Sequence, residues 1–334
     1  MSTSAPTIRT RPNPTCRFCG STGRLLYAGL KDRLFSAPGS WQLKQCPQPD
    51  CGLVWPDPVA LEEDLGLAYQ TYYTHVEPTG AVAKLKQALL SRGYRFAISI
   101  PAVVTGLQKE RHAFVRMFLD TLKPGRLFDA GCGDGQFLHL MAQEGWQGTG
   151  IDFDAAAIEA GRKKFGLELL VGDFQTATIT EAEYDAVTMS HVIEHVPDPV
   201  ACLDKCRRLL RPGGRLVVST PNIRSLGHQR FKDSWRGLEP PRHLQIFAPN
   251  LLGECARRAG LEVVRTGSTA VNADYISNAS LALENTPANG GRIGGGWDIR
   301  FALKSILFQY REHFAMRRNP DLGEEAFLIA ERRS

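Results

Sequence analysis

The sequence predicts an α/β fold, a doubly wound parallel sheet, with a small metal-binding module in front of it. From Leu127 onward, strand-like and helix-like patterns alternate, which is typical of a parallel sheet covered by helices on both faces. Four of the eight cysteines fall between residues 16 and 51, in two close pairs. Paired cysteines in a chain without a secretory signal favour metal binding over disulfides.

Composition and charge are those of an ordinary globular protein. The chain has 334 residues, of which 43% are apolar and 22% charged, and its length suits roughly two domains. No stretch approaches the roughly 20 apolar residues of a membrane span, and residues 1–15 lack the apolar core of a secretory signal. We therefore expect a cytoplasmic protein without a transmembrane segment. The net charge is only +5 and no run of five like charges occurs, so nucleic acid is not an expected partner.

The pattern divides the chain into five segments. We expect a disordered arm at 1–15, a zinc-ribbon-like module at 16–60, a helical connector at 61–120, the main α/β domain at 121–270, and a loop, a helix and a last strand at 271–334. An aromatic cluster in the connector, made of Tyr69, Tyr72 and Tyr73, is expected to pack the module onto the main domain, with a substrate lid as the alternative. Near the C-terminus, the apolar residues of 302–308 are expected to pack into the core, with an amphipathic surface for a partner or a membrane as the alternative.

The two cysteine pairs predict a structural zinc site. Its four ligands would be Cys16, Cys19, Cys46 and Cys51. The pairs are separated by 26 residues, and two such short loops can bring four thiolates into a tetrahedron. The second pair encloses four residues where a ribbon usually has two, so four unrelated thiols are the alternative. Four thiolates leave no open coordination position, and the site is therefore not expected to be catalytic.

Polar or glycine residues end each strand of the main domain. The first five strands are expected to begin at residue 127 and to run through 149–151, 167–171, 184–189 and 215–220, with helices that start near residues 137, 154 and 201. Ligands bind at the carboxyl edge of such a sheet. We therefore expect the binding site where these strands end.

A glycine loop follows the first of these strands. Gly131, Gly133 and Gly135 alternate after Asp129, whereas the dinucleotide fingerprint is G-x-G-x-x-G and would place a glycine where Gln136 stands. This spacing indicates a nucleoside pocket that has no pyrophosphate to hold.

Two acidic residues follow the next two strands. Asp152, 17 residues after Gly135, can accept both hydroxyls of a ribose, and Asp173 can accept from an adenine amino group. Phe153 and Phe174 come directly after these acids. Their rings could flank an adenine or could equally belong to the core.

These motifs, in this order, resemble the class I S-adenosylmethionine-dependent methyltransferases over residues 115–265. The resemblance implies a Rossmann-like, mostly parallel seven-stranded sheet, with an antiparallel last strand at residues 325–330. It implies that Asp129 and the glycine loop hold the methionine end of S-adenosylmethionine, Asp152 the ribose and Asp173 the adenine. The residues expected to bind the cofactor are Asp129, Gly131, Cys132, Gly133, Gly135, Asp152, Phe153, Asp173, Phe174, Ser190 and His191.

One subgroup is similar over further segments. Small-molecule methyltransferases of glycan and natural-product pathways often contain runs similar to residues 191–199 and 238–244, together with a front cysteine module that ends like residues 51–58. The resemblance implies methyl transfer to an oxygen or carbon nucleophile of a small-molecule acceptor, a sugar or a natural-product intermediate.

Three histidines are candidates for a general base, because imidazole titrates near neutral pH. We rank them in the order His191, His243, His195; a structural or orienting role is the alternative for each. His191, Glu194 and His195 also fit the H-x-x-E-H motif of inverted zinc peptidases. That motif needs a regular helix, which the prolines at 197 and 199 leave no room for. Glu194 and His195 could instead hold a divalent ion or only structure their loop.

Two other classes of function remain as alternatives. A zinc-ribbon RNA methyltransferase would use the basic front of the chain, but dense basic stripes with interleaved aromatic residues are missing from the sequence. A non-catalytic binding protein could keep the fold without the activity. The intact acids Asp129, Asp152 and Asp173 favour an active enzyme over that alternative.

Overall fold

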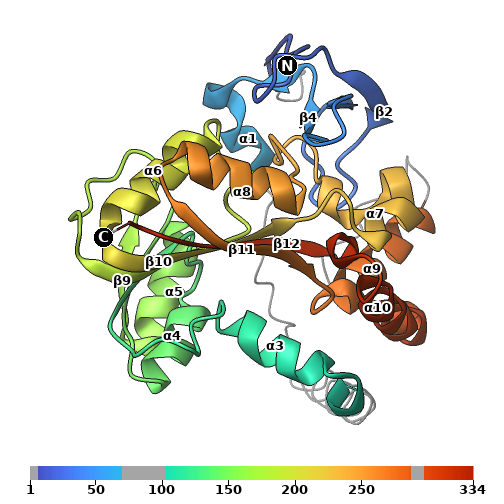
Figure 1. Ribbon diagram of the computed structural model, residues 1–334. Coiled ribbons are helices and arrows are strands. Elements are labelled where there is room, and N and C mark those ends of the chain that lie inside the picture. The colour runs from blue at the N-terminus through green and yellow to red at the C-terminus, as the bar shows by residue number, and fades with distance from the viewer. Residues whose placement is uncertain (1–6, 70–101, 287–296, 334) are drawn as a thin grey trace.

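A seven-stranded sheet forms the centre of the molecule (Figure 1). The computed structural model describes residues 7–69, 102–286 and 297–333. The strands are β6 (Arg126–Ala130), β7 (Gln147–Asp152), β8 (Glu168–Val171), β9 (Tyr184–Ser190), β10 (Leu210–Pro221), β11 (Glu262–Thr269) and β12 (Glu325–Glu331), in the order β11-β12-β10-β9-β6-β7-β8. The pairs from β10 through β9, β6 and β7 to β8 are parallel, whereas β12 runs antiparallel to both of its neighbours. The predicted mostly parallel seven-stranded sheet with an antiparallel last strand is confirmed.

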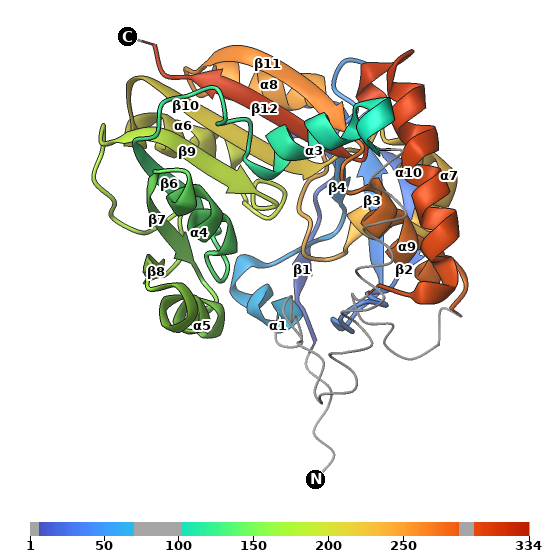
Figure 2. The ribbon, with the colours of Figure 1, turned by 90° about the horizontal axis from the view of Figure 1, so that it is seen from below.

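Helices cover both faces of this sheet. They are α3 (Leu107–Val115), α4 (Gln136–Gln143), α5 (Ala155–Phe165), α6 (Pro199–Leu209) and α8 (Pro249–Arg258). Because side chains alternate along a strand, Phe128 and Val187 belong to the core under α6 and α8, whereas Leu127 and Ala186 belong to the core under α4 and α5. Figure 2 shows α3 on one side of the sheet and α8 on the other. The doubly wound arrangement follows from this alternation.

Acidic N-caps start two of the helices. The Asp154 carboxylate accepts from two backbone N–H groups in the first turn of α5, as the sequence predicted. Asp198 caps α6 in the same way, and Pro199 occupies the first turn, so that α6 begins two residues earlier than predicted. Each cap also fixes the path of the preceding loop at the carboxyl edge of the sheet.

The N-terminal residues build two small sheets above α8 in Figure 1. Their elements are β1 (Thr10–Arg11), β2 (Arg24–Leu30), β3 (Trp41–Gln45), β4 (Val54–Pro56) and β5 (Val59–Ala60). The prediction of a disordered arm is wrong for its described part, because Thr10 and Arg11 pair with β5. The three-stranded sheet β2-β3-β4 shares a core with the segment before α8, where Val54 pairs with Ile246. The sequence gives no sign of this shared core, because its two halves lie almost 200 residues apart.

The connector and the C-terminal helices complete the fold. They comprise η1 (Glu62–Asp64), α1 (Gly66–Tyr69), α7 (Leu226–Phe231), η2 (Lys232–Ser234), η3 (Arg236–Leu238), α9 (Ala273–Glu284), η4 (Ile299–Phe301), α10 (Ala302–Met316) and η5 (Pro320–Leu322). Tyr72, Tyr73 and the glycine-rich residues 287–296 lie outside the described residues. None of the helices within 7–69, 102–286 and 297–333 combines the length and apolar character needed to cross a membrane.

The expectation that 302–308 packs into the core is wrong in part. On α10, Leu303 and Leu307 are 69% and 61% exposed, whereas the polar Gln309 and Glu312 are fully buried. The NH2 group of Gln309 finds partners here, because it donates to the backbone carbonyls of residues 270 and 271. Hydrophobicity alone could not predict which face of α10 turns inward.

A buried arginine joins three segments of the chain. The Arg242 side chain is fully buried; its Nε donates to Glu239 at 2.9 Å and its Nη1 to Asp32 at 2.8 Å. Nη1 also donates to the Ala68 carbonyl at 2.9 Å, and the guanidinium lies over the Phe35 ring. Asp32 belongs to the N-terminal region, Ala68 to α1 and Glu239 to the segment before α8. One cation therefore holds these three segments together.

Removal of this cation should destabilise the protein strongly. Arg242→Met leaves the buried carboxylate of Asp32 without its cation and leaves Glu239 with Arg236 alone, which costs about 3–5 kcal/mol of unfolding free energy. Urea denaturation at neutral pH measures the difference. As the matched control, Arg300→Met removes an arginine that is 77% exposed and should change the unfolding free energy by less than about 0.5 kcal/mol. Equal effects of the two substitutions would contradict the role assigned to Arg242.

Two buried carboxyl groups, Glu312 of α10 and Glu324 before β12, lie against each other. Burial and the neighbouring carboxylate raise the pKa of Glu312, and burial raises the pKa of Glu324 to about 8. The Trp235 indole N–H donates to Glu324. At neutral pH the folded chain therefore binds protons that these groups release on unfolding.

Stability should consequently fall as the pH rises. A carboxyl group whose pKa is 4.5 in the unfolded chain and about 8 in the folded chain keeps its proton only in the folded state between these values. The unfolding free energy then decreases by about 1 kcal/mol per pH unit across this window. Glu312→Gln removes one of the two groups that bind a proton on folding, so the decline should be shallower in urea titrations between pH 5 and 8. An unchanged slope would show that the pair does not titrate together.

Candidate functional site

The glycine loop after β6 follows a path that only glycine takes readily. Gly131, Gly133 and Gly135 have φ angles of +78°, +53° and +74°. A Cβ atom on Gly131 would lie 2.2 Å from a methyl carbon of Val192, so the loop also packs tightly against the residues after β9. Cys132 is buried with its side chain against Gly150 of β7. Its side chain therefore fills the core, and only its backbone belongs to the loop.

Two acids with different surroundings flank this loop. The Asp152 carboxylate accepts from the N–H groups of Gly133 and Asp154, each at 2.9 Å, and so ties the loop to the end of β7. Asp129 is 5% exposed and accepts from the Thr188 hydroxyl at 2.7 Å. Burial raises its pKa to about 7, and it forms no ion pair with any residue that the structure describes. A positively charged ligand beside this carboxyl group would stabilise its ionised form.

The third acid and the two aromatic residues divide between surface and core. Asp173 is exposed and accepts from the Gln175 N–H at 2.9 Å. Phe153 is 60% exposed, and its ring centroid lies 5.3 Å from that of Tyr69. Phe174 instead is 6% exposed and packs against Phe128 in the core. Of the two rings predicted to flank an adenine, only Phe153 is exposed at this edge of the sheet.

The end of β9 carries the residues expected beside the cofactor on the acceptor side. The Ser190 hydroxyl lies 3.0 Å from the Ser219 hydroxyl. His191 has a φ of +54°, which strains a residue with a side chain. Its Nε2 contacts Glu325, and its Nδ1 lies 3.3 Å from Glu194. Burial opposes a charge on the ring, but these carboxylates raise the pKa of His191 to about 10. A ring that is protonated at neutral pH is a poor proton acceptor, so this geometry disfavours the first-ranked base.

The other two histidines meet beside Glu194. The rings of His195 and His243 are 4.8 Å apart between centroids, and His243 is buried. Burial and the nearby His195 lower the pKa of His243 to about 4, so the ring is neutral at physiological pH. Glu194 is fully buried; burial opposes its charge, but His191 keeps the pKa of this carboxyl at about 2. The structure therefore gathers two imidazoles and one carboxylate at the carboxyl end of β9.

Residues that the sequence did not assign to the site complete it. The Tyr69 hydroxyl lies 3.0 Å from Nδ1 of His195, and its ring contacts Phe153. Tyr69 thus links Phe153, beside Asp152, to the histidines, whereas the sequence favoured a packing role for it over a place in a substrate lid. Glu325, the first residue of β12, pairs with His191 from 134 positions away. Neither contact leaves a local signal, because both depend on how distant segments meet.

The four paired cysteines converge at the N-terminal sheets. The sulfurs of Cys16 and Cys51 are 3.5 Å apart, those of Cys19 and Cys46 are 3.3 Å apart, and all four lie within 4.8 Å of one another. A disulfide would need about 2.05 Å, and the cysteines are free. Gly20 and Gly52, directly after the second cysteine of each pair, have φ angles of +71° and +59°. These turns direct backbone N–H groups at sulfur, those of Phe18 and Cys19 at Cys16, that of Gln48 at Cys46 and that of Leu53 at Cys51.

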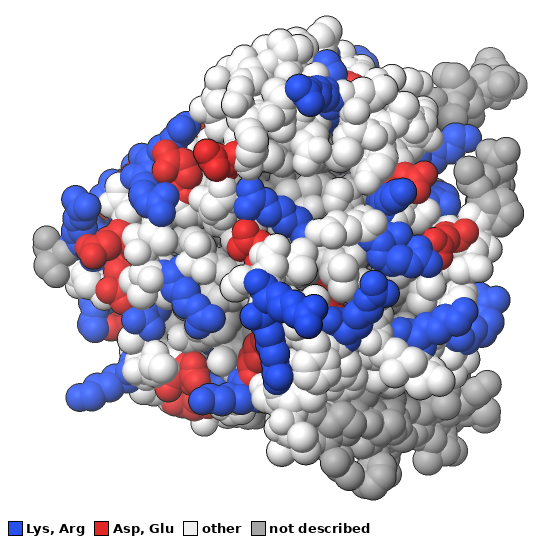
Figure 3. All heavy atoms as spheres, turned by 45° about the vertical axis from the view of Figure 1, so that its right-hand side comes forward, with Lys and Arg blue, Asp and Glu red and all other residues white. Residues whose placement is uncertain are grey.

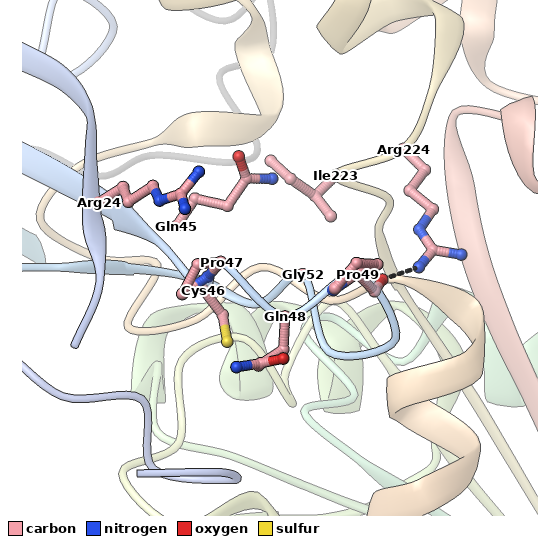
Figure 4. A pocket seen from close by; sticks show the side chains of 9 residues that line it. All are labelled: Arg24, Gln45, Cys46, Pro47, Gln48, Pro49, Gly52, Ile223 and Arg224. Atoms are coloured by element: carbon pink, nitrogen blue, oxygen red, sulfur yellow. Dashed lines mark hydrogen bonds between the residues drawn. The ribbon is translucent and has the colours of Figure 1, made fainter. Parts of the chain in front are cut away.

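A hollow of about 290 Å³ lies beside this cysteine cluster (Figure 4). Its lining comes from the N-terminal sheets and from Ile223 and Arg224 after β10. Arg224 donates to the Pro49 carbonyl at 2.9 Å across one side of it. None of the residues at the cofactor edge lines this hollow, so it belongs to the junction between the two parts of the protein.

Comparison with known proteins agrees with this geometry. The model of a methyltransferase domain family matches residues 107–266. Ubiquinone biosynthesis O-methyltransferases are similar: that of Alkalilimnicola ehrlichii is 37% identical over 115 residues, 33% of this chain and 47% of the relative. That of Xylella fastidiosa is 38% identical over 130 residues, 35% of this chain and 52% of the relative. The chain thus spans about half the length of these curated relatives.

A solved structure shows a weaker likeness. Phosphoethanolamine N-methyltransferase 2 of Haemonchus contortus is 15% identical, with a TM-score of 0.45 over 68% of this chain and 53% of that chain. The matched region, residues 107–266, contains the glycine loop, the three acids and the end of β9. The chain therefore contains a class I S-adenosylmethionine-dependent methyltransferase domain.

Proposed function

We propose that this protein transfers a methyl group from S-adenosylmethionine to an oxygen of a small-molecule acceptor, a sugar or a natural-product intermediate. The observation that carries the proposal is the pairing of two groups of residues. The first, the cofactor edge, is the glycine loop with Asp129 and Asp152. The second, the acceptor edge, is the cluster of Glu194, His195 and His243. Tyr69 lies between them, in contact with Phe153 and His195. The relatives named as O-methyltransferases support oxygen as the nucleophile.

The cofactor edge suits this ligand. Asp152 has two carboxylate oxygens with about four acceptor positions, of which two backbone N–H groups use two. The remaining positions can accept the two ribose hydroxyls. Asp129, buried and without an ion pair among the described residues, would face the positively charged methionine end. When bound, S-adenosylmethionine supplies a methyl group on a sulfonium, which needs position and orientation more than acid catalysis.

The acceptor edge supplies the groups that handle a hydroxyl proton. His243 is neutral at physiological pH and Glu194 is ionised. An acceptor hydroxyl that binds here can donate to an imidazole nitrogen as the oxygen becomes nucleophilic. His191, held between Glu194 and Glu325, acts as a positioning residue and not as the base. Glu194 and His243 are buried, which limits the access of water to this side of the reacting oxygen.

The surface does not favour an RNA substrate. On the face shown in Figure 3, Lys and Arg side chains lie among Asp and Glu side chains. Several arginines are paired, for example Arg224 with Asp321 and Arg230 with Glu284. RNA-binding proteins instead present continuous basic surfaces with exposed aromatic residues. A small-molecule acceptor remains the better proposal.

Calorimetry with S-adenosylhomocysteine tests the cofactor edge. Asp152→Ala removes a charged acceptor of two ribose hydrogen bonds and should weaken binding by about 10- to 100-fold, the equivalent of roughly 1.5–3 kcal/mol. Asp154→Asn is the matched control, because its side chain caps α5 and should leave the affinity within about twofold. Equal affinities of Asp152→Ala and the parent, or no binding by the parent, would refute the proposed function.

We also propose that the four paired cysteines hold a structural zinc ion. In a tetrahedron with zinc–sulfur bonds of 2.3 Å the sulfurs lie about 3.8 Å apart, close to the 3.3 and 3.5 Å of the two shortest pairs. Backbone N–H groups directed at three of the sulfurs stabilise thiolates, as in zinc knuckles. The cluster belongs to the core beneath α8, so the ion would tie the N-terminal sheets to the main domain.

Metal analysis of the purified protein tests the zinc proposal. The parent should contain about one thiolate-bound zinc per chain, and the double variant Cys16→Ser, Cys19→Ser should lose it. Cys255→Ser is the matched control, because Cys255 is a buried cysteine of α8 outside the cluster. Zinc content that does not change in the double variant would exclude this site.

A further inference from the structure

Three metal-ligand groups of the acceptor edge point to a second, different metal site. One ligand atom from each of Glu194, His195 and His243 lies within 4.8 Å of the other two. All three residues lie in loops at the carboxyl edge of the sheet, His243 in the segment before α8. They lie apart from the four cysteines and share none of their ligands. Two imidazoles and one carboxylate at one point are a donor set for first-row divalent cations.

Hydrogen bonds fix how both imidazoles present their lone pairs. Nδ1 of His243 lies 2.8 Å from the Gly237 carbonyl, and Nδ1 of His195 lies 3.1 Å from the Arg242 carbonyl. A carbonyl oxygen only accepts, so each Nδ1 carries the proton and each Nε2 keeps its lone pair. At His195 the Tyr69 hydroxyl oxygen, 3.0 Å from the same Nδ1, is then a second acceptor of this N–H group. Metal-binding histidines typically have this arrangement, with the second nitrogen donating to a backbone carbonyl. Both rings are therefore oriented as metal ligands before any ion binds.

The Glu194 carboxylate also has one oxygen that can bind a cation. Oε2 of Glu194 accepts from the Thr220 hydroxyl at 2.9 Å. Oε1 is buried and has no hydrogen bond to any described residue; its nearest cationic neighbour is His191 at 3.3 Å. A buried carboxylate oxygen without a hydrogen bond is costly unless another partner satisfies it. The ion pair with His191 compensates part of this cost, and a cation at this point would add the direct ligand bond that Oε1 lacks.

We propose that Glu194, His195 and His243 bind one divalent cation of the Mn²⁺, Fe²⁺ or Zn²⁺ type at the acceptor edge. Three protein ligands leave coordination positions open, as in catalytic metal sites, whereas four thiolates leave none. His195 is partly exposed, so one side of the site is accessible from solvent. The chain holds this cation without help from the cysteine cluster.

The role of the cation rests on the proposed function. An acceptor hydroxyl that takes an open position would have its pKa lowered by the charge, and its O–H proton would pass to water as the oxygen binds the cation. Nε2 of each histidine then serves as a ligand and no longer as a base. His191 is not a ligand of the cation, because it stays between Glu194 and Glu325.

Mn²⁺ binding to the full-length protein that carries one zinc per chain, at the thiolates, tests the site. Mn²⁺ prefers nitrogen and oxygen ligands, so it reports on this cluster and not on the thiolates. Electron paramagnetic resonance of free Mn²⁺ should show about one bound ion per chain. His195→Gln and His243→Gln should each weaken binding by at least tenfold. His139→Gln replaces a histidine of α4 outside the cluster and should bind like the parent.

The possible results separate this proposal from the proposed function. A parent that binds no stoichiometric Mn²⁺, or that binds it no better than His195→Gln, overturns the metal site. The parent measurement decides the question even if His243→Gln, at a buried position, fails to fold. Calorimetry with S-adenosylhomocysteine on the same samples shows whether the cofactor edge is intact. Cofactor binding without Mn²⁺ binding refutes only the metal site, whereas the loss of cofactor binding in the parent refutes the proposed function.

Discussion

The acceptor edge depends on one buried ion pair network, that of Arg242 with Glu239 and Asp32. A buried guanidinium has to keep its partners, because removal of either charge leaves the other uncompensated in the interior. The network therefore holds the N-terminal region, α1 and the segment before α8 in a fixed arrangement. The carbonyl of the same arginine accepts from His195. A charge pair that stabilises the fold thus also sets the orientation of a histidine in the site.

The two edges of the site are built in different ways, which determines how far each could be predicted. The cofactor edge consists of local turns: Asp152 binds the glycine loop 19 residues before it, and all of its parts follow strands in order. Spacing alone therefore predicted the glycine loop and the positions of the three acids at strand ends. At the acceptor edge, Tyr69 contacts His195 and Glu325 contacts His191, and more than 100 residues separate the partners in each case. Such contacts leave no periodic signal in the chain.

The errors of prediction have physical causes of the same kind. Phe174 follows an acid at a strand end, as Phe153 does, but a neighbouring helix covers it and Lys205 lies over its ring. The arm at 7–15 has the composition of a disordered segment, yet β5 offers Thr10 and Arg11 a pairing edge. On α10, Glu312 is buried against Glu324, and burial together with this neighbour raises its pKa, so that the side chain is buried without a charge. In each case a tertiary neighbour decided between two local alternatives.

Charge balance explains why the end of β9 is built around His191. Glu194 and Glu325 are both almost fully buried, and two buried carboxylates at one place repel each other. The protonated ring of His191 lies between them and compensates one of the two charges. Its positive φ is the backbone strain that this placement requires. One negative charge remains at the acceptor edge, where it suits the divalent ion proposed there. At the cofactor edge, burial raises the pKa of Asp129 to about 7, so the positively charged methionine end of the proposed cofactor would stabilise its ionised form.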